Sequence, residues 1–267
     1  KKIEIQKQKD MHIVFLESLG VCECVISQLC EPLKKAGHTI TYYPDRNEEE
    51  EVLIERGHEA DIIVVSNIPL RKHFLDHCPN LKMISVAFTG LDHIDLETCR
   101  QRGITVRNAA GYSTHAVAEL AIGMMIAVYR KIVGGDAITR LGGDRRNFLG
   151  TELHQKTLGI IGTGAIGYQV ARLGLAFGCR VIAYNRTPRE LENIRMVDKN
   201  TLLQEADIIS LHIPLTPETK DFIGEAEFKL MQPHAILINT ARGPIVNKKV
   251  LHEALRKSKI AGAAVDV

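Results

Sequence analysis

The sequence predicts an α/β protein built from two successive doubly wound parallel sheets. Its 267 residues correspond to about two domains at roughly 150 residues each. Short apolar segments alternate with helical segments along most of the chain, which is the pattern of parallel strands joined by crossover helices. A glycine-rich turn, GTGAIG at 162–167, follows a predicted strand and precedes a predicted helix. Together these features favour two parallel-sheet domains.

The first series of elements lies in the N-terminal part of the chain. The predicted strands are 12–18, 39–43, 61–66, 81–88 and 105–108, and the predicted helices are 24–36, 48–56, 70–76 and 96–102. The acidic run at 47–51 is expected to form the solvated first turn of the second of these helices, where the helix dipole favours negative charge.

The second series begins near Thr157. Its predicted strands are 158–162, 180–185, 207–214, 235–241 and 260–267, and its predicted helices are 166–177, 225–230 and 248–256. We therefore expect a first domain over residues 11–107 and a second over residues 108–267.

Between the two series lies THAVAELAIGMMIAVYRK, residues 114–131. This segment is apolar on nearly all sides, so we expect a helix that is buried on more than one face. It either packs only within the core or also buries a face against a second subunit. A two-fold homodimer is expected, because isologous pairs are the commonest assembly.

Composition excludes several classes of function. The net charge is +2, and the basic residues are not clustered, so no nucleic-acid partner is implied. The longest apolar run, Leu120 to Tyr129, is about half of what a membrane span needs. The N-terminal KKIEIQKQKD lacks the apolar core of a secretion signal. We expect a cytoplasmic protein without a membrane partner.

The six cysteines stand at 22, 24, 30, 78, 99 and 179. Cys22 and Cys24 in VCECV are spaced so that both could face a metal, but no second Cys or His pair accompanies them at ligand spacing. We therefore predict ordinary reduced thiols and no metal site.

The glycine turn carries the strongest chemical signal. Gly162, Gly164 and Gly167 form GxGxxG between strand and helix, the context that makes this motif specific for a dinucleotide. The first glycine allows a tight turn, the second lets the backbone approach a pyrophosphate, and the third lets the helix pack against the strand. The anion is expected on the amides of 164–167, including those of Ala165 and Ile166, at the helix N-terminus.

The end of the next strand bears on the choice of dinucleotide. An NAD site places Asp or Glu there for the ribose hydroxyls, whereas this sequence has Asn185, Arg186 and Thr187. A guanidinium attracts a 2′-phosphate by about 1 kcal/mol at 4 Å in water and by about 4 kcal/mol at an effective dielectric constant of 20. We therefore favour NADP(H). The alternative is a solvated Arg186, with Asn185 binding the ribose of NAD(H).

The chain resembles the D-isomer-specific 2-hydroxyacid dehydrogenase family, which includes phosphoglycerate dehydrogenase and glyoxylate/hydroxypyruvate reductase. The motifs that carry the resemblance are SVAFTGLDHIDL, NAAGYSTHAVAEL, LGIIGTGAIG, SLHIPLTPETK, LINTARGPIVN and IAGAAVDV, in the order of the family. The resemblance covers nearly everything after Met11. It implies a flavodoxin-like substrate domain followed by a Rossmann domain that also forms the dimer.

The resemblance also assigns site residues. Arg242 of TARG matches the catalytic arginine that binds the carboxylate and carbonyl oxygen of a 2-oxo acid, a role that suits the forked donors of a guanidinium. The amides around Thr89 and Gly90 match the loop that receives the substrate carboxylate. Asp266 matches the acid that bonds the nicotinamide carboxamide.

The remaining assignments concern the cofactor. The resemblance places Thr114 near the nicotinamide and His212, Pro214 and Thr219 beside the adenosine ribose. Thr240 and Ala241, which precede Arg242, are also expected at the cofactor. Other histidines, such as His93 and His115, are interpreted as structural or surface residues.

The C-terminal run IAGAAVDV, residues 260–267, predicts a short strand buried on both faces. The catalytic Glu and His of the family match no residue here, and we expect them beyond Val267, in a segment that also completes the substrate domain. Either a longer enzyme contains this chain, or the chain binds a dinucleotide without turnover, and we expect residues 1–267 alone to be inactive.

The sequence therefore predicts an oxidoreductase that transfers a hydride between NAD(P)H and a small 2-oxo acid, with glyoxylate or hydroxypyruvate favoured. A dinucleotide-sensing corepressor or binding protein is the alternative, because a fold does not determine a function.

Overall fold

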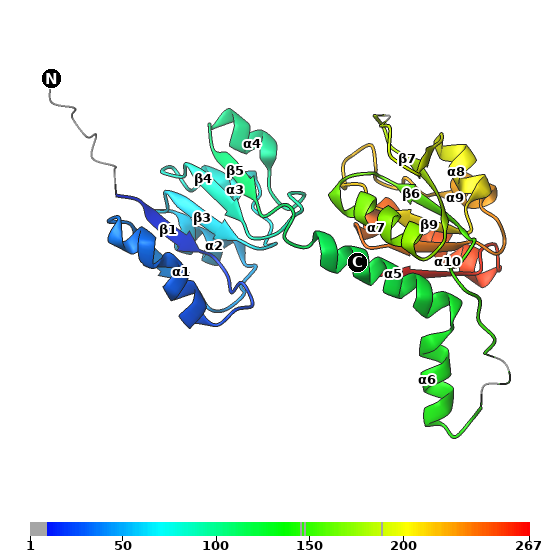
Figure 1. Ribbon diagram of the computed structural model, residues 1–267. Coiled ribbons are helices and arrows are strands. Elements are labelled where there is room, and N and C mark those ends of the chain that lie inside the picture. The colour runs from blue at the N-terminus through cyan, green and yellow to red at the C-terminus, as the bar shows by residue number, and fades with distance from the viewer. Residues whose placement is uncertain (1–9, 145, 147, 188) are drawn as a thin grey trace. The chain divides into compact units, whose positions relative to one another are not determined.

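The computed structural model describes residues 10–144, 146, 148–187 and 189–267. The chain divides into two compact units, a first unit up to Tyr112 and a second unit from Ser113 onwards (Figure 1). Each unit is built on one sheet in which every pair of neighbouring strands is parallel. This confirms the predicted fold class.

The sheet of the first unit has the strand order β2-β1-β3-β4-β5, the order of flavodoxin-like sheets. Its strands are β1 (His12–Phe15), β2 (Thr39–Tyr42), β3 (Ile62–Val65), β4 (Met83–Val86) and β5 (Thr105–Asn108). Its helices are α1 (Glu23–Lys35), α2 (Glu50–Gly57), α3 (Lys72–Asp76) and α4 (Leu96–Gln101).

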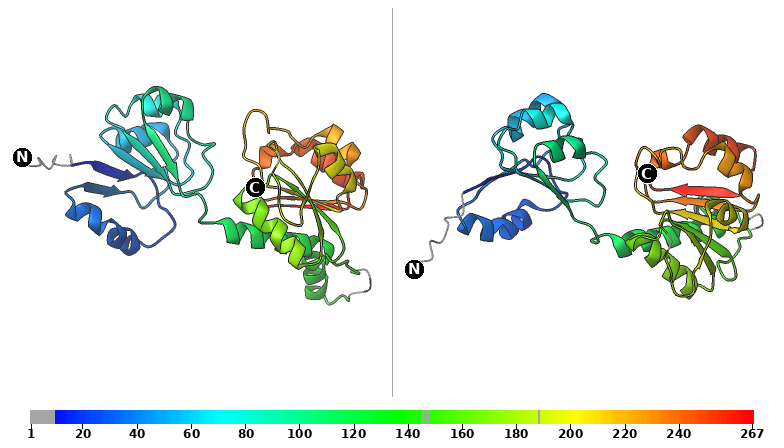
Figure 2. Two further views of the ribbon diagram at one scale, coloured as in Figure 1. Left: turned by 45° about the horizontal axis from the view of Figure 1, so that its top comes forward. Right: turned by 90° about the horizontal axis from the view of Figure 1, so that it is seen from above.

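The helices of the first unit cover both faces of its sheet (Figure 2). Ile13 and Phe15 of β1 pack in one cluster with residues of α1, whereas Val14 packs in another with residues of α2, α3 and α4. Successive strand residues point to opposite faces, so the apolar runs of these strands are needed to fill a core on each side.

The sheet of the second unit has the order β11-β10-β9-β6-β7-β8. Counted along this unit, the order is 6-5-4-1-2-3, which is that of a Rossmann fold. The strands are β6 (Thr157–Ile161), β7 (Arg180–Tyr184), β8 (Arg195–Met196), β9 (Ile208–Leu211), β10 (Ile236–Asn239) and β11 (Gly262–Val265).

Helices α5 (Thr114–Tyr129) and α7 (Ala165–Ala176) pack on one face of this sheet. Helices α8 (Lys199–Glu205), α9 (Glu225–Leu230) and α10 (Lys248–Arg256) pack on the other. A 3₁₀ turn, η1 (Gly243–Ile245), follows β10. Helix α6 (Ile132–Arg140) contributes no buried residue and extends away from the sheet (Figure 1).

One expectation about the second unit is wrong, and another is not met within the chain itself. The strand at 260–267 was expected to be buried on both faces, but β11 pairs only with β10 and its residues are half-buried or exposed. Helix α5 buries Ala118, Ile122 and Met125 on one side, whereas Leu120 on the other side is 40% exposed. Its second apolar face is therefore not covered by the described residues of this chain.

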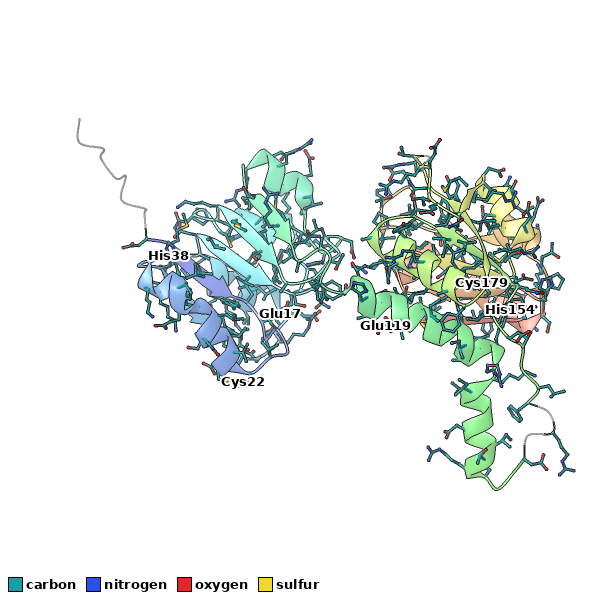
Figure 3. All side chains as sticks on the ribbon, viewed as in Figure 1. Glu17, Cys22, His38, Glu119, His154 and Cys179 are labelled. Carbon is teal, nitrogen blue, oxygen red and sulfur yellow. A yellow bond between two sulfur atoms is a disulfide. The ribbon has the colours of Figure 1, made fainter. Side chains whose placement is uncertain are left out.

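The prediction of six reduced thiols is also wrong, because Cys22 and Cys24 form a disulfide at the start of α1 (Figure 3). The pair spans one residue, and the turn that begins α1 brings the two sulfur atoms together. The other four cysteines are free and buried. Burial raises the pKa of Cys78 to about 11, which makes this thiol unreactive near neutral pH.

No helix within the described ranges is both long enough and apolar enough to span a membrane.

Candidate functional site

The glycine turn after β6 has a different steric reason for each glycine. Gly162 has φ +97°, and a β-carbon there would lie 2.6 Å from the carbonyl oxygen of His212. A β-carbon at Gly167 would collide with the carbonyl oxygen of Gly162. A β-carbon at Gly164 would have no atom within 4 Å. Gly162 and Gly167 therefore allow close packing, whereas Gly164 borders open space.

The open space lies at the positive end of α7. Gly164 is the N-cap residue, and the first turn contains no acidic residue. The first amides of a helix, here those of Ala165, Ile166 and Gly167, have no partner within the helix. Thr163 is 2% exposed, and its hydroxyl has no hydrogen-bond partner among the described residues. A buried, unsatisfied hydroxyl beside free helix amides fits the phosphates of a dinucleotide.

Asn185, directly after β7, makes hydrogen bonds within the protein through both ends of its side chain. Its Oδ1 accepts a hydrogen bond from the amide of Thr163 at 3.2 Å, and its Nδ2 donates to the carbonyl of Thr187 at 2.6 Å. The side chain thus fixes the glycine turn. Arg186 is exposed.

Arg189 was not among the predicted site residues, but its guanidinium donates to the carbonyl oxygen of Thr163 at 3.2 Å. The feature of the sequence that could have indicated this residue is a second arginine three positions after Arg186 in NRTPR. The carboxylate of Glu218 would compete with a phosphate for Arg186. The pKa of Glu218 is lowered, first by a hydrogen bond from Thr216 and to a smaller extent by the charge of Arg186.

The loop after β9 carries three of the predicted cofactor residues. Burial lowers the pKa of His212 to about 4, so its imidazole is neutral at pH 7, and its Nε2 pairs with the hydroxyl of Ser210 at 2.9 Å. The hydroxyl of Thr219 donates to the carbonyl of Pro214 at 2.7 Å and accepts from the amide of Thr216 at 2.7 Å. Hydrogen bonds within the loop therefore fix its conformation, and its first residue, His212, lies beside the glycine turn.

Arg242 and Asp266 follow adjacent strands. The Nη1 of Arg242 donates to the carbonyl of Ala241 at 2.8 Å, and the amide of Asp266 donates to the carbonyl of Asn239 at 3.0 Å. The hydroxyl of Thr240 is buried and has no hydrogen-bond partner within the described ranges, so it is available to a ligand.

All these loops follow the carboxyl ends of β6, β7, β9, β10 and β11. The strand order reverses between β6 and β9, and ligands of open parallel sheets bind at such a switch point. Two strand spacings separate β6 from β10, or roughly 10 Å. The glycine turn and Arg242 thus share one edge of one sheet.

The predicted substrate loop belongs to the first unit. Thr89 and Gly90 follow β4 and are half-buried, and the carbonyl oxygen of Thr89 accepts from the Nδ2 of Asn108 at 2.6 Å. Thr114 is the first residue of α5 in the second unit. His93 is buried and its carbonyl accepts from the amide of Leu70, whereas His115 is exposed.

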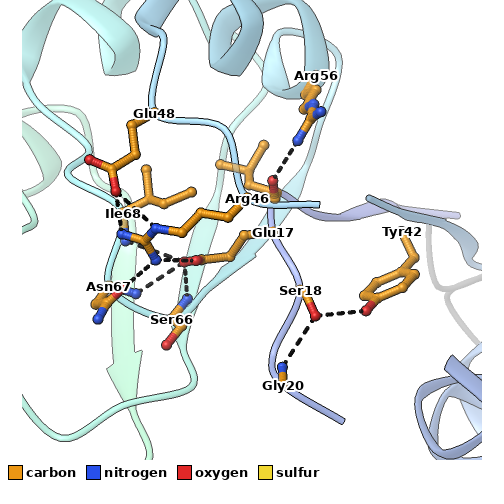
Figure 4. Close-up of polar contacts among 11 residues, drawn as sticks. Glu17, Ser18, Gly20, Tyr42, Arg46, Glu48, Arg56, Ser66, Asn67 and Ile68 are labelled. Carbon is orange, nitrogen blue, oxygen red and sulfur yellow. Dashed lines mark hydrogen bonds and ion pairs between the residues drawn. The ribbon is translucent and has the colours of Figure 1, made fainter. Parts of the chain in front are cut away.

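Sequence reasoning also missed Glu17, which follows β1 and is 1% exposed. Its Oε1 accepts from the amides of Ser66, Asn67 and Ile68 at 2.7, 3.0 and 3.2 Å, and its Oε2 accepts from Arg46 at 2.7 Å (Figure 4). This carboxylate holds the loop after β3 at the carboxyl edge of the first sheet. The available signal was an acid directly after an apolar strand.

Within the described ranges, no group of three or more His, Cys, Asp and Glu side chains is arranged to hold a metal ion.

A parallel sheet in Rossmann order, with a glycine turn opening onto a helix N-terminus at its switch point, defines a dinucleotide-binding α/β protein. The model of the D-isomer specific 2-hydroxyacid dehydrogenase NAD-binding domain matches residues 122–267. The chain belongs to the D-isomer-specific 2-hydroxyacid dehydrogenase family.

Named relatives agree with this family. The glyoxylate reductase of Thermococcus litoralis is 44% identical over 81% of this chain and 69% of its own length. The D-3-phosphoglycerate dehydrogenase of Methanocaldococcus jannaschii is 42% identical over 81% of this chain, which spans 43% of that protein. An acyclic imino acid reductase solved with NADPH and D-Arg is 34% identical, with a TM-score of 0.88 over 96% of this chain and 82% of that one.

Proposed function

We propose that this chain binds a nicotinamide dinucleotide and serves an oxidoreductase that reduces a small 2-oxo acid to a D-2-hydroxy acid. The observation that carries the proposal is the open space at Gly164 on the N-terminus of α7, on the same sheet edge as Arg242. The bound nicotinamide would supply the hydride. The names of the relatives support a 2-oxo acid as the acceptor.

Each site residue has a role in this proposal. The guanidinium of Arg242 would bind the carboxylate through two donors and stabilise the negative charge that develops on the carbonyl oxygen. The amides around Thr89 and Gly90, in the first unit, would bind a substrate carboxylate, and Asp266 would accept a hydrogen bond from the carboxamide of the cofactor.

We assign no proton donor among the described residues. His212 is neutral at pH 7, because burial lowers its pKa to about 4, and its Nε2 already pairs with Ser210. A carbonyl reduction needs a group that is protonated near the working pH. We therefore expect residues 1–267 alone to bind ligands without turnover.

NADP(H) is the proposed cofactor. Asn185 uses both ends of its side chain within the protein, and it carries no negative charge that would repel a 2′-phosphate. Arg186 and Arg189 place two guanidinium groups on the loop after β7, where a 2′-phosphate would pair with them. The NADPH complex of the imino acid reductase supports the same choice.

Glyoxylate or hydroxypyruvate is the proposed substrate, since the similar protein of Thermococcus litoralis is a glyoxylate reductase. We also propose a homodimer formed by the second unit. Exposed apolar residues on and beyond α6 support this: Val133 is 76% exposed and Leu141 is 84% exposed.

The deciding experiment is a fluorescence titration of this chain with NADPH and NADH. The variant Gly164→Val fills the open space and should abolish binding of both, while Gly224→Val, at the N-cap of α9, should leave binding unchanged. Equal binding by wild type and Gly164→Val would overturn the proposal. Dinucleotide binding without binding of glyoxylate or hydroxypyruvate would favour the sensing role instead.

A further inference from the structure

Asn239 is the last residue of β10 and is 1% exposed. Its Oδ1 accepts a hydrogen bond from the amide of Ala241 at 3.0 Å, and its Nδ2 donates to the carbonyl of Arg242 at 2.9 Å. A carboxamide can make both contacts only in one orientation, because one partner is a donor and the other an acceptor. The two contacts therefore fix the orientation of the Asn239 side chain.

The guanidinium of Arg242 closes a ring with these contacts. Its Nη1 donates to the carbonyl of Ala241 at 2.8 Å, and the amide of that same residue is held by Asn239. Three residues thus form a ring of hydrogen bonds. Asn239 accepts from the amide of Ala241, the carbonyl of Ala241 accepts from the guanidinium of Arg242, and the carbonyl of Arg242 accepts from Asn239. The side-chain oxygen and nitrogen of the buried Asn239 therefore both have a partner within the ring, as a buried carboxamide requires.

We propose that Asn239 is a positioning residue, which aims the guanidinium of Arg242 at the carboxylate of the substrate. This inference rests on the proposed function, in which Arg242 binds a 2-oxo acid. The backbone of Asn239 is also hydrogen-bonded to Asp266, but through its carbonyl, which a side-chain substitution leaves in place. Changes at the side chain of Asn239 should therefore affect the substrate and spare the cofactor.

The test uses Asn239→Asp, which has the same size and keeps the acceptor for the amide of Ala241. It replaces the donor by an oxygen that repels the carbonyl of Arg242. Asn239→Ala, which removes both contacts, is a second variant in case the buried carboxylate prevents folding. The matched control is Asn247→Ala, because Asn247 caps α10 through its contact with the amide of Val250 and has no role in the ring.

Two affinities are measured for each protein: that of NADPH alone, and that of oxamate, a 2-oxo acid analogue, in the presence of NADPH. We expect the Asn239 variants to bind oxamate about 10- to 100-fold more weakly, the range that a displaced positioning group can cost, with NADPH affinity changed less than about 2-fold. The control should lose thermal stability and keep both affinities.

The outcomes separate this inference from the proposed function. Loss of NADPH and oxamate affinity in parallel, an unchanged oxamate affinity, or an equal loss in Asn247→Ala would overturn the positioning role. Failure of the wild-type chain to bind either NADPH or NADH would overturn the proposed function. A wild type that binds NADPH but not oxamate would refute the carboxylate-binding role of Arg242, and the role of Asn239 with it.

Discussion

The carbonyl oxygen of His212 lies 2.6 Å from the position that a β-carbon of Gly162 would occupy. The turn after β6 and the start of the loop after β9 therefore pack backbone against backbone at the switch point of the sheet. Only a glycine fits this approach, and the positive φ of Gly162 adds a second reason.

We predict that Gly162→Ala destabilises the second unit by about 2 to 4 kcal/mol, because it combines backbone strain with a clash against main-chain atoms. Gly164→Ala is the matched control. It introduces the same methyl group into open space and should cost less than about 1 kcal/mol. Hydrogen exchange of peptides from β6 and β9 measures both effects, and equal protection in the two variants would contradict the steric account.

The cofactor preference should depend on Arg186. Replacing it with alanine removes a charged partner of the 2′-phosphate, so the affinity for NADPH should fall about 10-fold while that for NADH changes little. Asn185→Asp should lower NADPH affinity further through charge repulsion. Dissociation constants from fluorescence titration provide the comparison, and a wild type that prefers NADH would refute the NADP assignment.

Glu17 should stabilise the first unit. Glu17→Ala leaves the amides of Ser66, Asn67 and Ile68 without their acceptor, and we expect a loss of about 3 kcal/mol or more. Glu48→Ala removes the other carboxylate that pairs with Arg46. That carboxylate is 60% exposed, so its loss should cost less than about 1 kcal/mol. Exchange rates in β1 and β3 distinguish the two variants.

The stability of the second unit should fall on acidification. Burial lowers the pKa of His212 to about 4, below the value of about 6.5 in the unfolded chain. Between these values the unfolded state binds a proton that the folded state does not. Stability is therefore retained above pH 6.5 and is lost as the pH falls toward 4, by up to about 3 kcal/mol.

Urea unfolding between pH 7 and pH 4 measures this loss. His212→Gln, which keeps an amide near Ser210 but does not titrate, should show a smaller decrease. Identical slopes for the two proteins would show that His212 does not contribute.

The dimer should depend on α6. Val133→Glu places a charge on a side chain that is 76% exposed, so folding should be unaffected while the dimer dissociates. Thr139→Glu adds the same charge at another exposed position of the helix and should leave the dimer intact. Light scattering after gel filtration gives the mass, and a wild-type monomer would refute the proposed assembly.

Some boundaries were predictable from the sequence, because local signals mark them. Strand β5 and helices α9 and α10 have the bounds that were predicted. Three elements were missed. Strand β8 has two residues, too few for a periodic pattern, and α6 contains two consecutive glycines, which lower helix propensity. The signal for α8 was present, since Asp198 caps it through the amide of Thr201.

The amino-acid sequence by itself determined the α/β class, the glycine turn and the position of Arg242, because strand and helix periodicity and the demand for glycine act over a few neighbouring residues. Only the tertiary structure decided which side chains engage distant backbone groups. Glu17 holds amides that lie 49 to 51 positions away, and Asn185 holds the amide of Thr163 across 22 positions. Burial likewise depends on neighbours, and the residues of β11 are half-buried or exposed because β11 pairs only with β10 here. Strand order and packing bring such groups together, and no local pattern encodes that proximity.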